Sequence, residues 1–314
     1  MCTYNGEKFI CEQMESIASQ GLLPYELVVC DDRSTDSTIA LLRSFADRVR
    51  FPVKIVSNEQ RLGPAKNFEK AILHCGGDVI VLSDQDDIWR PDKLQKFAHA
   101  LDRNPDAAYA FSNGDMVDEN GVSAGRTMWE AVGLQRKLMQ FSGSNQLRLL
   151  LKRNLIAGAS MAFRASFRDV VVPIPSGWLH DYWIVLMGSA LSRGVAIPDR
   201  LLIYRRHATQ AVGWRKRTFG QSVQESIAAG QSVLLAKVEQ FRQIRKRVDS
   251  VHPFLQCSAE CLDLLTQKEN HLENRASMRS AVGLSRVAQV LVEACTGRYQ
   301  RYSDSWFSIA RDLR

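Results

Sequence analysis

Three carboxylates, Asp84, Asp86 and Asp87, lie within four positions directly after the apolar run VIVL at residues 79–82. Carboxylates this close repel one another unless a cation or several hydrogen-bond donors lie among them. In an extended segment residues i and i+2 point to the same side, so Asp84 and Asp86 can face one ligand. A hard divalent cation, Mg²⁺ or Mn²⁺, binds through one or two carboxylates plus phosphate oxygens. The cluster therefore predicts either a cation site or a polar turn ahead of the helix that follows Pro91.

Short apolar runs alternate with helical patterns over the first 110 residues. The segment FICEQMESIASQG, for example, places Ile10, Met14 and Ile17 at helical spacing. Four short apolar runs predict strands, at residues 27–30, 53–56, 78–82 and 107–111. This alternation predicts an α/β fold with a mostly parallel sheet and helices on both faces.

Polar residues lie where three of these elements meet the expected edge of the sheet. They are the group Thr3, Tyr4 and Asn5, the pair Asp31 and Asp32, and the cluster from Asp84 to Asp87. In an open parallel sheet ligands bind outside the carboxyl ends of the strands. Three segments that bring polar groups to one edge are more than turn formation requires, so we expect a binding site there.

The second half of the chain has a different character. Residues 114–145 predict loop and weak helix, 160–164 a strand, 180–194 a helix and 195–207 a broken strand. From Trp214 onward the pattern is helical, and 16 Lys and Arg stand against 10 Asp and Glu, so most of the net charge of +7 belongs to this tail. We therefore predict two domains, 1–213 and a basic helical extension at 214–314.

The composition indicates a protein of the cytoplasm. Seven cysteines form no paired framework, and Cys30 lies inside an apolar strand, as free thiols do in a reducing compartment. A signal peptide is not recognisable, and the apolar stretch at 182–191 is too short to span a bilayer. We expect a cytoplasmic location, in which the basic tail either packs on the first domain as a helical cap or makes peripheral contact with the inner face of the cytoplasmic membrane.

Five segments carry a family resemblance. They are CTYNG at 2–6, VVCDDRSTDST at 28–38, LSDQDDIWRPDKL at 82–94, LHDYW at 179–183 and YRRHATQAVG at 204–213. Together, in this order, they resemble the inverting, metal-dependent glycosyltransferases of family 2, most of all the bacterial rhamnosyltransferase-like members. The resemblance covers about residues 1–213 and implies a GT-A fold, which is Rossmann-like.

The resemblance also implies a donor site for a nucleotide diphospho-sugar, either dTDP-rhamnose or a UDP-sugar. Asp86 would bind the metal directly, with His207 as a further metal ligand. Asp31 and Asp32 would contact the nucleoside, although an Asx turn before a capped helix explains the same pair. The other residues expected to bind the nucleotide-sugar are Thr3, Tyr4, Asn5, Arg61, Asp84 and Gln85.

Asp181 is the candidate catalytic base. An inverting transfer needs a carboxylate on the face opposite the leaving group, where it accepts the proton of the acceptor hydroxyl. The resemblance puts this base at the second residue of the His180-Asp181 pair, and a helix N-cap is the plainer interpretation of the same residue. On the acceptor side we expect His180 and Trp178, and Asp87 either there or orienting the loop.

One departure from the family concerns the first strand. Family members have a central apolar strand directly before the CTYNG segment, whereas here only Met1 and Cys2 precede Thr3. A sheet that lacks a central strand keeps unpaired backbone groups and a slot in its core. We therefore expect a misassigned start or a truncated gene, and we expect an added upstream strand to raise the melting temperature.

The residues favour an enzyme of hexosyl or rhamnosyl transfer, acting on a glycan or lipid-linked acceptor in surface polysaccharide synthesis. A truncated, catalytically inactive homologue that only binds nucleotide-sugars is the alternative. A nucleotidyltransferase of similar fold is disfavoured because the N-terminal region has no Gly-rich phosphate loop with a following Arg. Nucleic acid is not an expected partner, because the basic residues of the tail do not accompany aromatic residues in a binding pattern.

Overall fold

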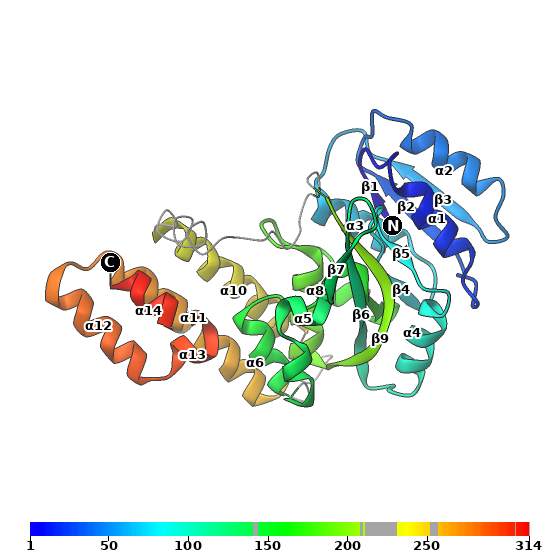
Figure 1. Ribbon diagram of the computed structural model, residues 1–314. Helices are drawn as coiled ribbons and strands as arrows, with labels where there is room; N and C mark the ends of the chain where they lie inside the picture. Colours follow the sequence, from blue (N-terminus) through cyan, green and yellow to red (C-terminus); the bar gives the residue numbers. More distant parts are fainter. Residues whose placement is uncertain (141–143, 208–209, 211–230, 252–256, 305, 314) are drawn as a thin grey trace. The chain divides into compact units, whose positions relative to one another are not determined.

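The computed structural model describes residues 1–140, 144–207, 210, 231–251, 257–304 and 306–313 (Figure 1). The chain divides into two compact units. Unit 1 comprises Met1–Phe141, Leu155–Gly188 and Ser192–Ala211, and unit 2 comprises Ser142–Asn154, Ser189–Leu191 and Val212–Arg314. The boundary expected between residues 213 and 214 lies outside the described residues and stays a prediction.

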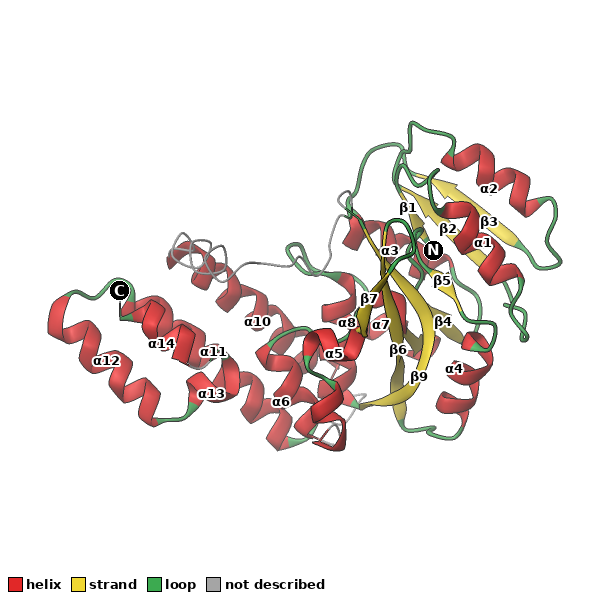
Figure 2. Ribbon diagram, viewed as in Figure 1, coloured by secondary structure: helices red, strands yellow, loops and turns green. Residues whose placement is uncertain are grey.

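Unit 1 is an α/β structure, as Figure 2 shows by its mixture of helices and strands. Its strands are β1 (Cys2–Thr3), β2 (Leu27–Asp31), β3 (Val53–Ser57), β4 (Val79–Val81), β5 (Ile88–Trp89), β6 (Ala107–Asp118), β7 (Ser123–Thr127), β8 (Met161–Arg164) and β9 (Arg193–Arg206). Its helices are α1 (Ile10–Ala18), α2 (Thr38–Ala46), α3 (Pro64–His74), α4 (Lys93–Asp102), α5 (Met128–Val132), α7 (Arg168–Val171) and α8 (His180–Leu191), the last of which ends in unit 2, with 3₁₀ turns η1 (Gln135–Gln140), η2 (Gly158–Ser160) and η3 (Ala165–Phe167).

The strands form two sheets. The first has the order β1-β2-β3 and is entirely parallel, as the alternating pattern predicts. The second has the order β4-β8-β6-β9-β5, with β7 paired to β6. This second sheet is mixed, because β8 is antiparallel to both β4 and β6 while β9 is parallel to β6. The α/β fold class is confirmed, and the antiparallel members were not foreseen from the pattern.

The segment 114–145, expected to be loop and weak helix, contains a β-hairpin. Strand β6 continues to Asp118 and pairs antiparallel with β7. The Oδ1 atom of Asp118 accepts hydrogen bonds from the backbone N–H groups of Asn120 and Val122, both at 2.9 Å, and Gly121 adopts a φ of 81°. An Asx turn with glycine at a positive φ is an efficient hairpin closure, so turn chemistry outweighs the weak strand pattern.

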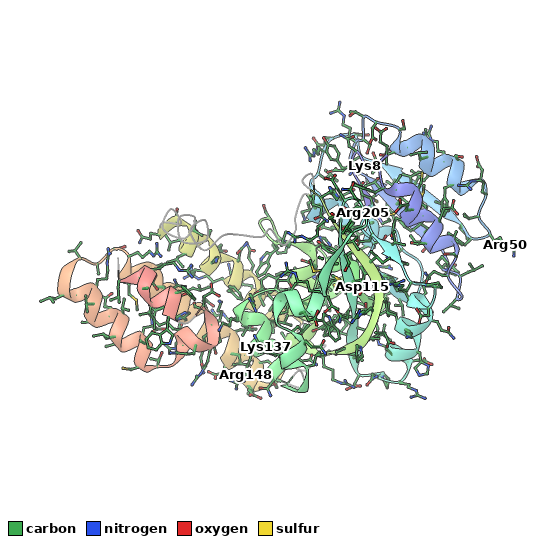
Figure 3. The ribbon with its side chains drawn as sticks, viewed as in Figure 1. Lys8, Arg50, Asp115, Lys137, Arg148 and Arg205 are labelled. Atoms are coloured by element: carbon green, nitrogen blue, oxygen red, sulfur yellow. The ribbon has the colours of Figure 1, made fainter. Side chains whose placement is uncertain are left out.

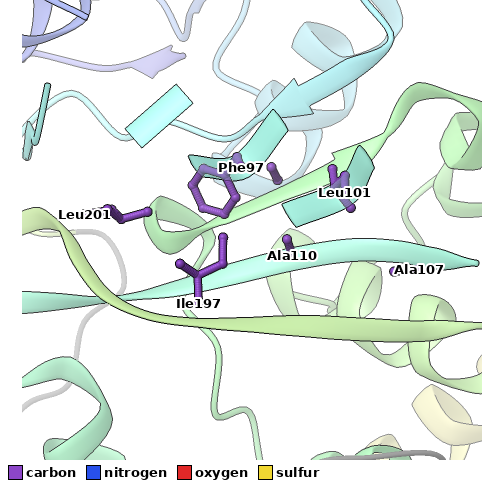
Figure 4. Packing of buried hydrophobic residues seen from close by; sticks show 7 residues of the cluster. Phe97, Leu101, Ala107, Ala110, Ile197 and Leu201 are labelled. Carbon is purple, nitrogen blue, oxygen red and sulfur yellow. The ribbon is translucent and has the colours of Figure 1, made fainter. Parts of the chain in front are cut away.

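Helix α4 packs on the second sheet through one apolar face. Phe97 and Leu101 are buried against Ala110 of β6 and Ile197 and Leu201 of β9, and Figure 4 shows this packing from close by. The residues of α4 that point inward are spaced as expected for an amphipathic helix. This packing fixes the start of α4 behind the carboxylate cluster.

The region around β1 joins the first sheet to the segment after β4. Strand β1 is two residues long, and the Cys2 N–H donates to the carbonyl oxygen of Ser83, two residues after β4, at 3.2 Å. Upstream of it, the Met1 ammonium donates to the Val28 carbonyl oxygen at 2.7 Å. Beyond Met1 a cavity of about 390 Å³ lies between β2 and β4, lined largely by apolar side chains.

Unit 2 is helical. Its helices are α6 (Ser144–Lys152), α10 (Gln231–Val251), α11 (Ala259–Met278), α12 (Gly283–Cys295), α13 (Arg298–Tyr302) and α14 (Trp306–Asp312). The apolar stripe expected on α10 is buried, with Leu234, Val238, Phe241, Ile244 and Val248. Among the described helices, none is long and apolar enough to cross a membrane.

Candidate active site

The carboxylate cluster lies between β4 and β5, at the edge of the second sheet. Asp86 and Asp87 are buried, with exposures of 7% and 1%. The Oδ2 atom of Asp86 lies 2.7 Å from the Nε2 atom of His207, a residue 121 positions away in the sequence. His207 directly follows β9, and its ring packs on Phe9 with the ring centroids 4.8 Å apart. The two residues expected to bind a metal are therefore in direct contact.

The cluster carries more negative charge than its surroundings neutralise. Burial, together with the charges of Asp86 and Asp181, raises the pKa of Asp84 to about 7. Burial and the charges of Asp86 and Asp84 also raise the pKa of Asp87 well above its ordinary value. The Oδ2 atom of Asp87 is buried and has no hydrogen-bond partner among the described residues. Such a site gains free energy from any cation that enters it.

Lys93 is a buried cation at the start of α4 that the sequence pattern did not single out. Its side chain is fully buried, its Nζ atom donates to the Ala159 carbonyl oxygen at 2.7 Å, and it lies 4.2 Å from the ring centroid of Trp89. Burial lowers the pKa of Lys93 to about 7, although Asp87 and Asp84 act in the opposite direction. In the sequence Lys93 reads as a surface residue of a helix, and nothing local distinguishes it.

Arg205, which Figure 3 labels, lies near the end of β9. Its Nε atom donates to the Asp86 carbonyl oxygen at 3.2 Å, its backbone N–H donates to Asp87 Oδ1 at 3.2 Å, and its guanidinium pairs with Glu12. The Arg205 side chain is 6% exposed and lies over the Phe9 ring. Arg205 therefore holds the loop and neutralises Glu12.

The residues present fit a divalent cation. In the described part of the chain there is no group of three or more His, Cys, Asp and Glu side chains placed to hold a metal by themselves. Mg²⁺ and Mn²⁺ sites in enzymes that act on phosphates often have only one or two protein ligands, and phosphate oxygens complete the shell. The Asp86 carboxylate and the His207 imidazole, with the unpartnered Asp87 oxygen behind them, match that donor set.

Asp31 and Asp32 follow β2 and are engaged by the chain itself. Asp31 accepts hydrogen bonds from Thr3 Oγ1 at 2.7 Å, from Ser34 Oγ at 2.6 Å and from the Ser34 backbone N–H at 2.8 Å. Asp32 accepts from the backbone N–H groups of Leu62 at 2.7 Å and Gly63 at 2.9 Å. Both carboxylates are buried, so they shape the loops that surround the expected nucleoside site.

Tyr4 and Arg61 form the exposed part of this region. The Arg61 guanidinium lies 3.8 Å from the centroid of the Tyr4 ring, so two residues predicted to bind the nucleotide are adjacent. Gln85 is tied to the Tyr4 backbone by two hydrogen bonds of 2.8 and 3.1 Å, and Asn5 accepts from the Thr35 backbone N–H at 2.8 Å. Thr3 is buried and supports Asp31. Gln85, Asn5 and Thr3 therefore hold the loop that presents Tyr4.

Asp181 lies in the first turn of α8, whose N-cap is Leu179. Its Oδ2 atom accepts from the Gly158 backbone N–H at 3.1 Å, and its Oδ1 atom accepts from the Tyr182 N–H at 2.6 Å. A Cβ atom at Gly158 would lie 2.8 Å from the His180 Nε2 atom, so this close approach requires glycine. After burial and Asp86, the charge of Asp181 also contributes to the raised pKa of Asp84.

The turn η2 connects the candidate base with the cluster. Its Gly158 N–H binds Asp181, and the carbonyl oxygen of the next residue, Ala159, binds Lys93. Sequence reasoning missed both Gly158 and Lys93. The only local signal is a glycine in a short segment between predicted elements, and that signal does not identify the partner.

Two residues expected on the acceptor side lie in packed surroundings. The His180 ring stacks on Phe68 with the centroids 3.8 Å apart, neither of its nitrogens has a hydrogen-bond partner among the described residues, and burial lowers its pKa to about 3. Trp178 is 5% exposed and packs against the rings of Tyr182 and Trp183, so it has little surface left for stacking on a sugar. For Asp87 the buried position fits orientation of the loop.

A family profile described as Glycosyl transferase family 2 matches residues 1–171. The chain is 28% identical over 211 residues to the uncharacterized protein Rv1520 of Mycobacterium tuberculosis, with 66% of this chain and 57% of that protein aligned. The chain thus spans less than two thirds of that relative's length.

Two further relatives carry names with a donor. WfgD of Escherichia coli, a UDP-Glc:alpha-D-GlcNAc-diphosphoundecaprenol beta-1,3-glucosyltransferase, is 28% identical, with 52% of this chain and 62% of WfgD aligned. The dTDP-rhamnosyl transferase RfbG of Shigella flexneri is 35% identical, but the alignment covers 39% of this chain and 41% of RfbG. The likeness to a rhamnosyltransferase therefore rests on a short segment.

Solved structures share the fold. Staphylococcus aureus TarS 1–349 in complex with UDP-GlcNAc aligns with a TM-score of 0.55 at 15% identity, covering 99% of this chain and 89% of TarS. The mannosyltransferase PcManGT of Pyrobaculum calidifontis, in complex with GDP-Man and Mn²⁺, aligns with a TM-score of 0.50 at 20% identity, covering 99% and 83%. The GT-A fold expected for this chain is confirmed by this likeness.

Proposed function

Because the chain belongs to glycosyltransferase family 2, we propose that it transfers a sugar from a nucleotide diphospho-sugar to a glycan or lipid-linked acceptor in surface polysaccharide synthesis. The observation that carries this proposal is the contact between Asp86 and His207, with Asp181 and Lys93 both hydrogen-bonded to the turn η2. A metal-binding pair beside a candidate base is what a metal-assisted transfer requires. The enzyme would work on the cytoplasmic side of the membrane.

We propose a donor with a pyrimidine base, a UDP-sugar or dTDP-rhamnose. The names of WfgD and RfbG, which carry UDP-Glc and dTDP-rhamnosyl, support this choice. Tyr4, stacked on the Arg61 guanidinium, offers a flat surface for the base, and the positive charge of Arg61 suits the diphosphate. The acidic pair Asp31 and Asp32 keeps the surrounding loops in place.

Asp86 and His207 would hold the divalent cation, Mg²⁺ or Mn²⁺. When bound, the ion supplies positive charge to the diphosphate that leaves. In its absence Asp84 and Asp87 retain protons more strongly than ordinary carboxyls do. The proposed role of Lys93 and Arg205 is to keep the loop in one geometry whether or not the ion is present.

Asp181 is the proposed base. It accepts the proton of the acceptor hydroxyl as the hydroxyl oxygen forms a bond to the anomeric carbon. The bond from that carbon to the diphosphate oxygen breaks, and the nucleoside diphosphate leaves with the bonding electrons. Attack from the face opposite the leaving group inverts the configuration. The Gly158 N–H, which donates to Asp181 Oδ2, keeps the carboxylate oriented.

The first experiment is a thermal-shift panel of UDP, dTDP and GDP, each with and without Mn²⁺, on the chain and on Asp86→Ala. We expect one nucleotide to raise the melting temperature only with Mn²⁺, and Asp86→Ala to abolish that rise. Asp199→Asn is the matched control, because Asp199 is an exposed carboxylate of unit 1 that pairs with Lys96. A folded chain that responds to no nucleotide would contradict the proposal.

The second candidate is an inactive homologue that binds nucleotide-sugars without turnover, and the gap between β2 and β4 is the observation that favours it. Measuring nucleoside diphosphate release from the donor found in the panel separates the two. Release that disappears in Asp181→Asn, while Mn²⁺-dependent binding persists, supports the enzyme. Binding without release, with any candidate acceptor, supports the homologue.

A further inference from the structure

Helix α12 of unit 2 has its apolar side outward. Its exposed positions are Gly283, Leu284, Ser285, Val287, Ala288, Leu291, Val292 and Cys295, and no charged residue is among them. Leu284, Leu291 and Val292 are 88%, 57% and 68% exposed. At the spacing of an α-helix these positions form one continuous side. An ordinary surface helix turns such a side toward the core, so the orientation of α12 calls for a partner.

Helix α14 repeats this arrangement. Trp306 is 75% exposed, Phe307 58% and Leu313, the residue after the helix, 41%, while Ala310 is exposed between them. The two helices contact each other, and Val290 of α12 and Ile309 of α14 are buried in the same core cluster. We call the exposed apolar residues of α12 and α14 the α12–α14 face.

The acidic residues of these two helices point inward. Glu293 is 2% exposed and accepts hydrogen bonds from His271 at 2.7 Å and Asn274 at 2.8 Å. Asp312 is 1% exposed and is bound by Arg275 at 2.5 and 3.1 Å. The α12–α14 face therefore presents apolar surface without a carboxylate, and burying that face desolvates no negative charge.

We propose that the α12–α14 face docks on the surface of an anionic lipid membrane. Trp and Phe that project from a short apolar helix face are suited to the boundary between headgroups and acyl chains. From residue 214 onward the chain carries 16 Lys and Arg against 10 Asp and Glu, and this surplus favours anionic lipid over a second copy of the same positive segment. The docking surface goes beyond the proposed donor site and does not depend on it.

The test uses the full chain and vesicles in a flotation assay. One set of vesicles contains phosphatidylglycerol and phosphatidylcholine, and the other contains phosphatidylcholine alone. We expect binding to the anionic vesicles, weaker binding to the neutral ones, and a loss of roughly tenfold or more in Leu291→Gln/Trp306→Gln. The matched control is Tyr25→Gln/Leu73→Gln, which changes two residues of unit 1 that are 77% and 54% exposed.

A second measurement separates lost docking from lost folding. Brominated acyl chains should quench part of the tryptophan fluorescence of the full chain, and Trp306→Phe should bind the vesicles normally while losing that part of the quenching. Equal binding by the chain and Leu291→Gln/Trp306→Gln would overturn the proposal, as would equal binding to neutral and anionic vesicles. A dimer in light scattering that Leu291→Gln/Trp306→Gln abolishes, without vesicle binding, would assign the face to a second copy and overturn it too.

Discussion

Each of the two units buries a cluster of charged side chains, and the clusters differ in how completely their charges are paired. In unit 2 the Glu293 carboxylate is bound by His271 and Asn274, and the Asp312 carboxylate by Arg275, Arg279 and Tyr299. In unit 1 the buried Lys93 is influenced by the charges of Asp87 and Asp84, and Asp87 Oδ2 has no partner among the described residues.

This difference separates a structural network from a binding site. A buried network whose members are all paired fixes one arrangement of its helices and needs no ligand to neutralise it. A buried cluster with surplus negative charge lowers the stability of the folded state, and a bound cation offsets that loss of stability. Burial alone does not distinguish the two clusters, because both contain buried charged residues. The informative property is whether each charge has a partner of opposite charge or a hydrogen-bond partner.

The largest expected effect comes from Asp86→Asn. Removing one carboxylate from the unbalanced cluster should lower sugar transfer by at least about 10²-fold, because the ion loses a ligand. The same change should leave the melting temperature of the metal-free chain unchanged or higher, because it relieves repulsion with Asp84 and Asp87. Activity assays and calorimetry on one preparation check both parts. A lower melting temperature with normal activity would mean that the cluster is structural.

Asp312→Asn should lower the stability of the chain and leave nucleotide binding unchanged. It leaves the buried guanidinium of Arg275 without its charged partner, and losing one member of a buried ion pair costs about 3–5 kcal/mol of the free energy of unfolding. We expect Mn²⁺-dependent nucleotide binding to persist at low temperature, where the variant is folded. Asp304→Asn, which breaks the exposed pair with Arg311, is the control and should cost about 1 kcal/mol or less.

Lys93→Met would make the surroundings of the carboxylate cluster still more negative. The metal concentration that gives half of the thermal shift should fall by roughly tenfold, because a positive charge no longer competes with the ion. Turnover should fall as well, because the Ala159 carbonyl loses its donor and the neighbouring Gly158 no longer holds Asp181 as firmly. Lys96→Met, an exposed lysine on the same helix, should change neither quantity. Weaker metal binding in Lys93→Met would refute the electrostatic part.

The smallest effect is a pH dependence of opposite sign for two buried groups, one in each unit. Burial, with the charges of Asp86 and Asp181, raises the pKa of Asp84 to about 7, so the folded state binds more protons at Asp84 than the unfolded state between about pH 4 and pH 7. Without metal, the stability that Asp84 contributes to unit 1 should therefore be lost as the pH rises through this range. The lowered pKa of His180 acts in the opposite direction, so the Asp84 contribution is the difference between the chain and Asp84→Asn.

For His271 in unit 2 burial lowers the pKa, with Glu293 acting against this. The unfolded state then binds more protons below the ordinary His value, about 6.5. Unit 2 should therefore lose stability as the pH falls through about 6.5. Hydrogen exchange of peptides from the two units, in the chain, in Asp84→Asn and in His271→Gln at pH 5.5 and 7.5 without metal, measures the sign of each contribution. The same sign for the Asp84 and His271 contributions would contradict this assignment.

Much of the fold follows from local patterns. The runs at 27–30 and 53–56 became β2 and β3 because short apolar segments bounded by turn residues have few other uses. Strand β8 enters the second sheet antiparallel, and no local pattern encodes that choice. The hairpin that joins β6 and β7 was not predicted, because the Asp118 side chain directs the turn and the sequence of β7 has only a weak strand pattern.

The site was predictable where family motifs supplied a long-range relation. Asp86 and His207 are 121 residues apart, and only the resemblance joined them before the fold did. The family motifs assign no role to Lys93 or Gly158. Their contacts could not be inferred from the sequence, because each contact involves a backbone atom, which carries no sequence signature. The acceptor-side role of Trp178 stays a prediction, and its 5% exposure leaves little surface for a sugar.

The cavity between β2 and β4 has a consequence for how this protein responds to small molecules. Its volume is about 390 Å³ and its lining is largely apolar, and apolar cavities in proteins take up small apolar compounds. A hydrophobic compound that fills the cavity of the folded chain should therefore raise its melting temperature, because the unfolded chain offers no such site.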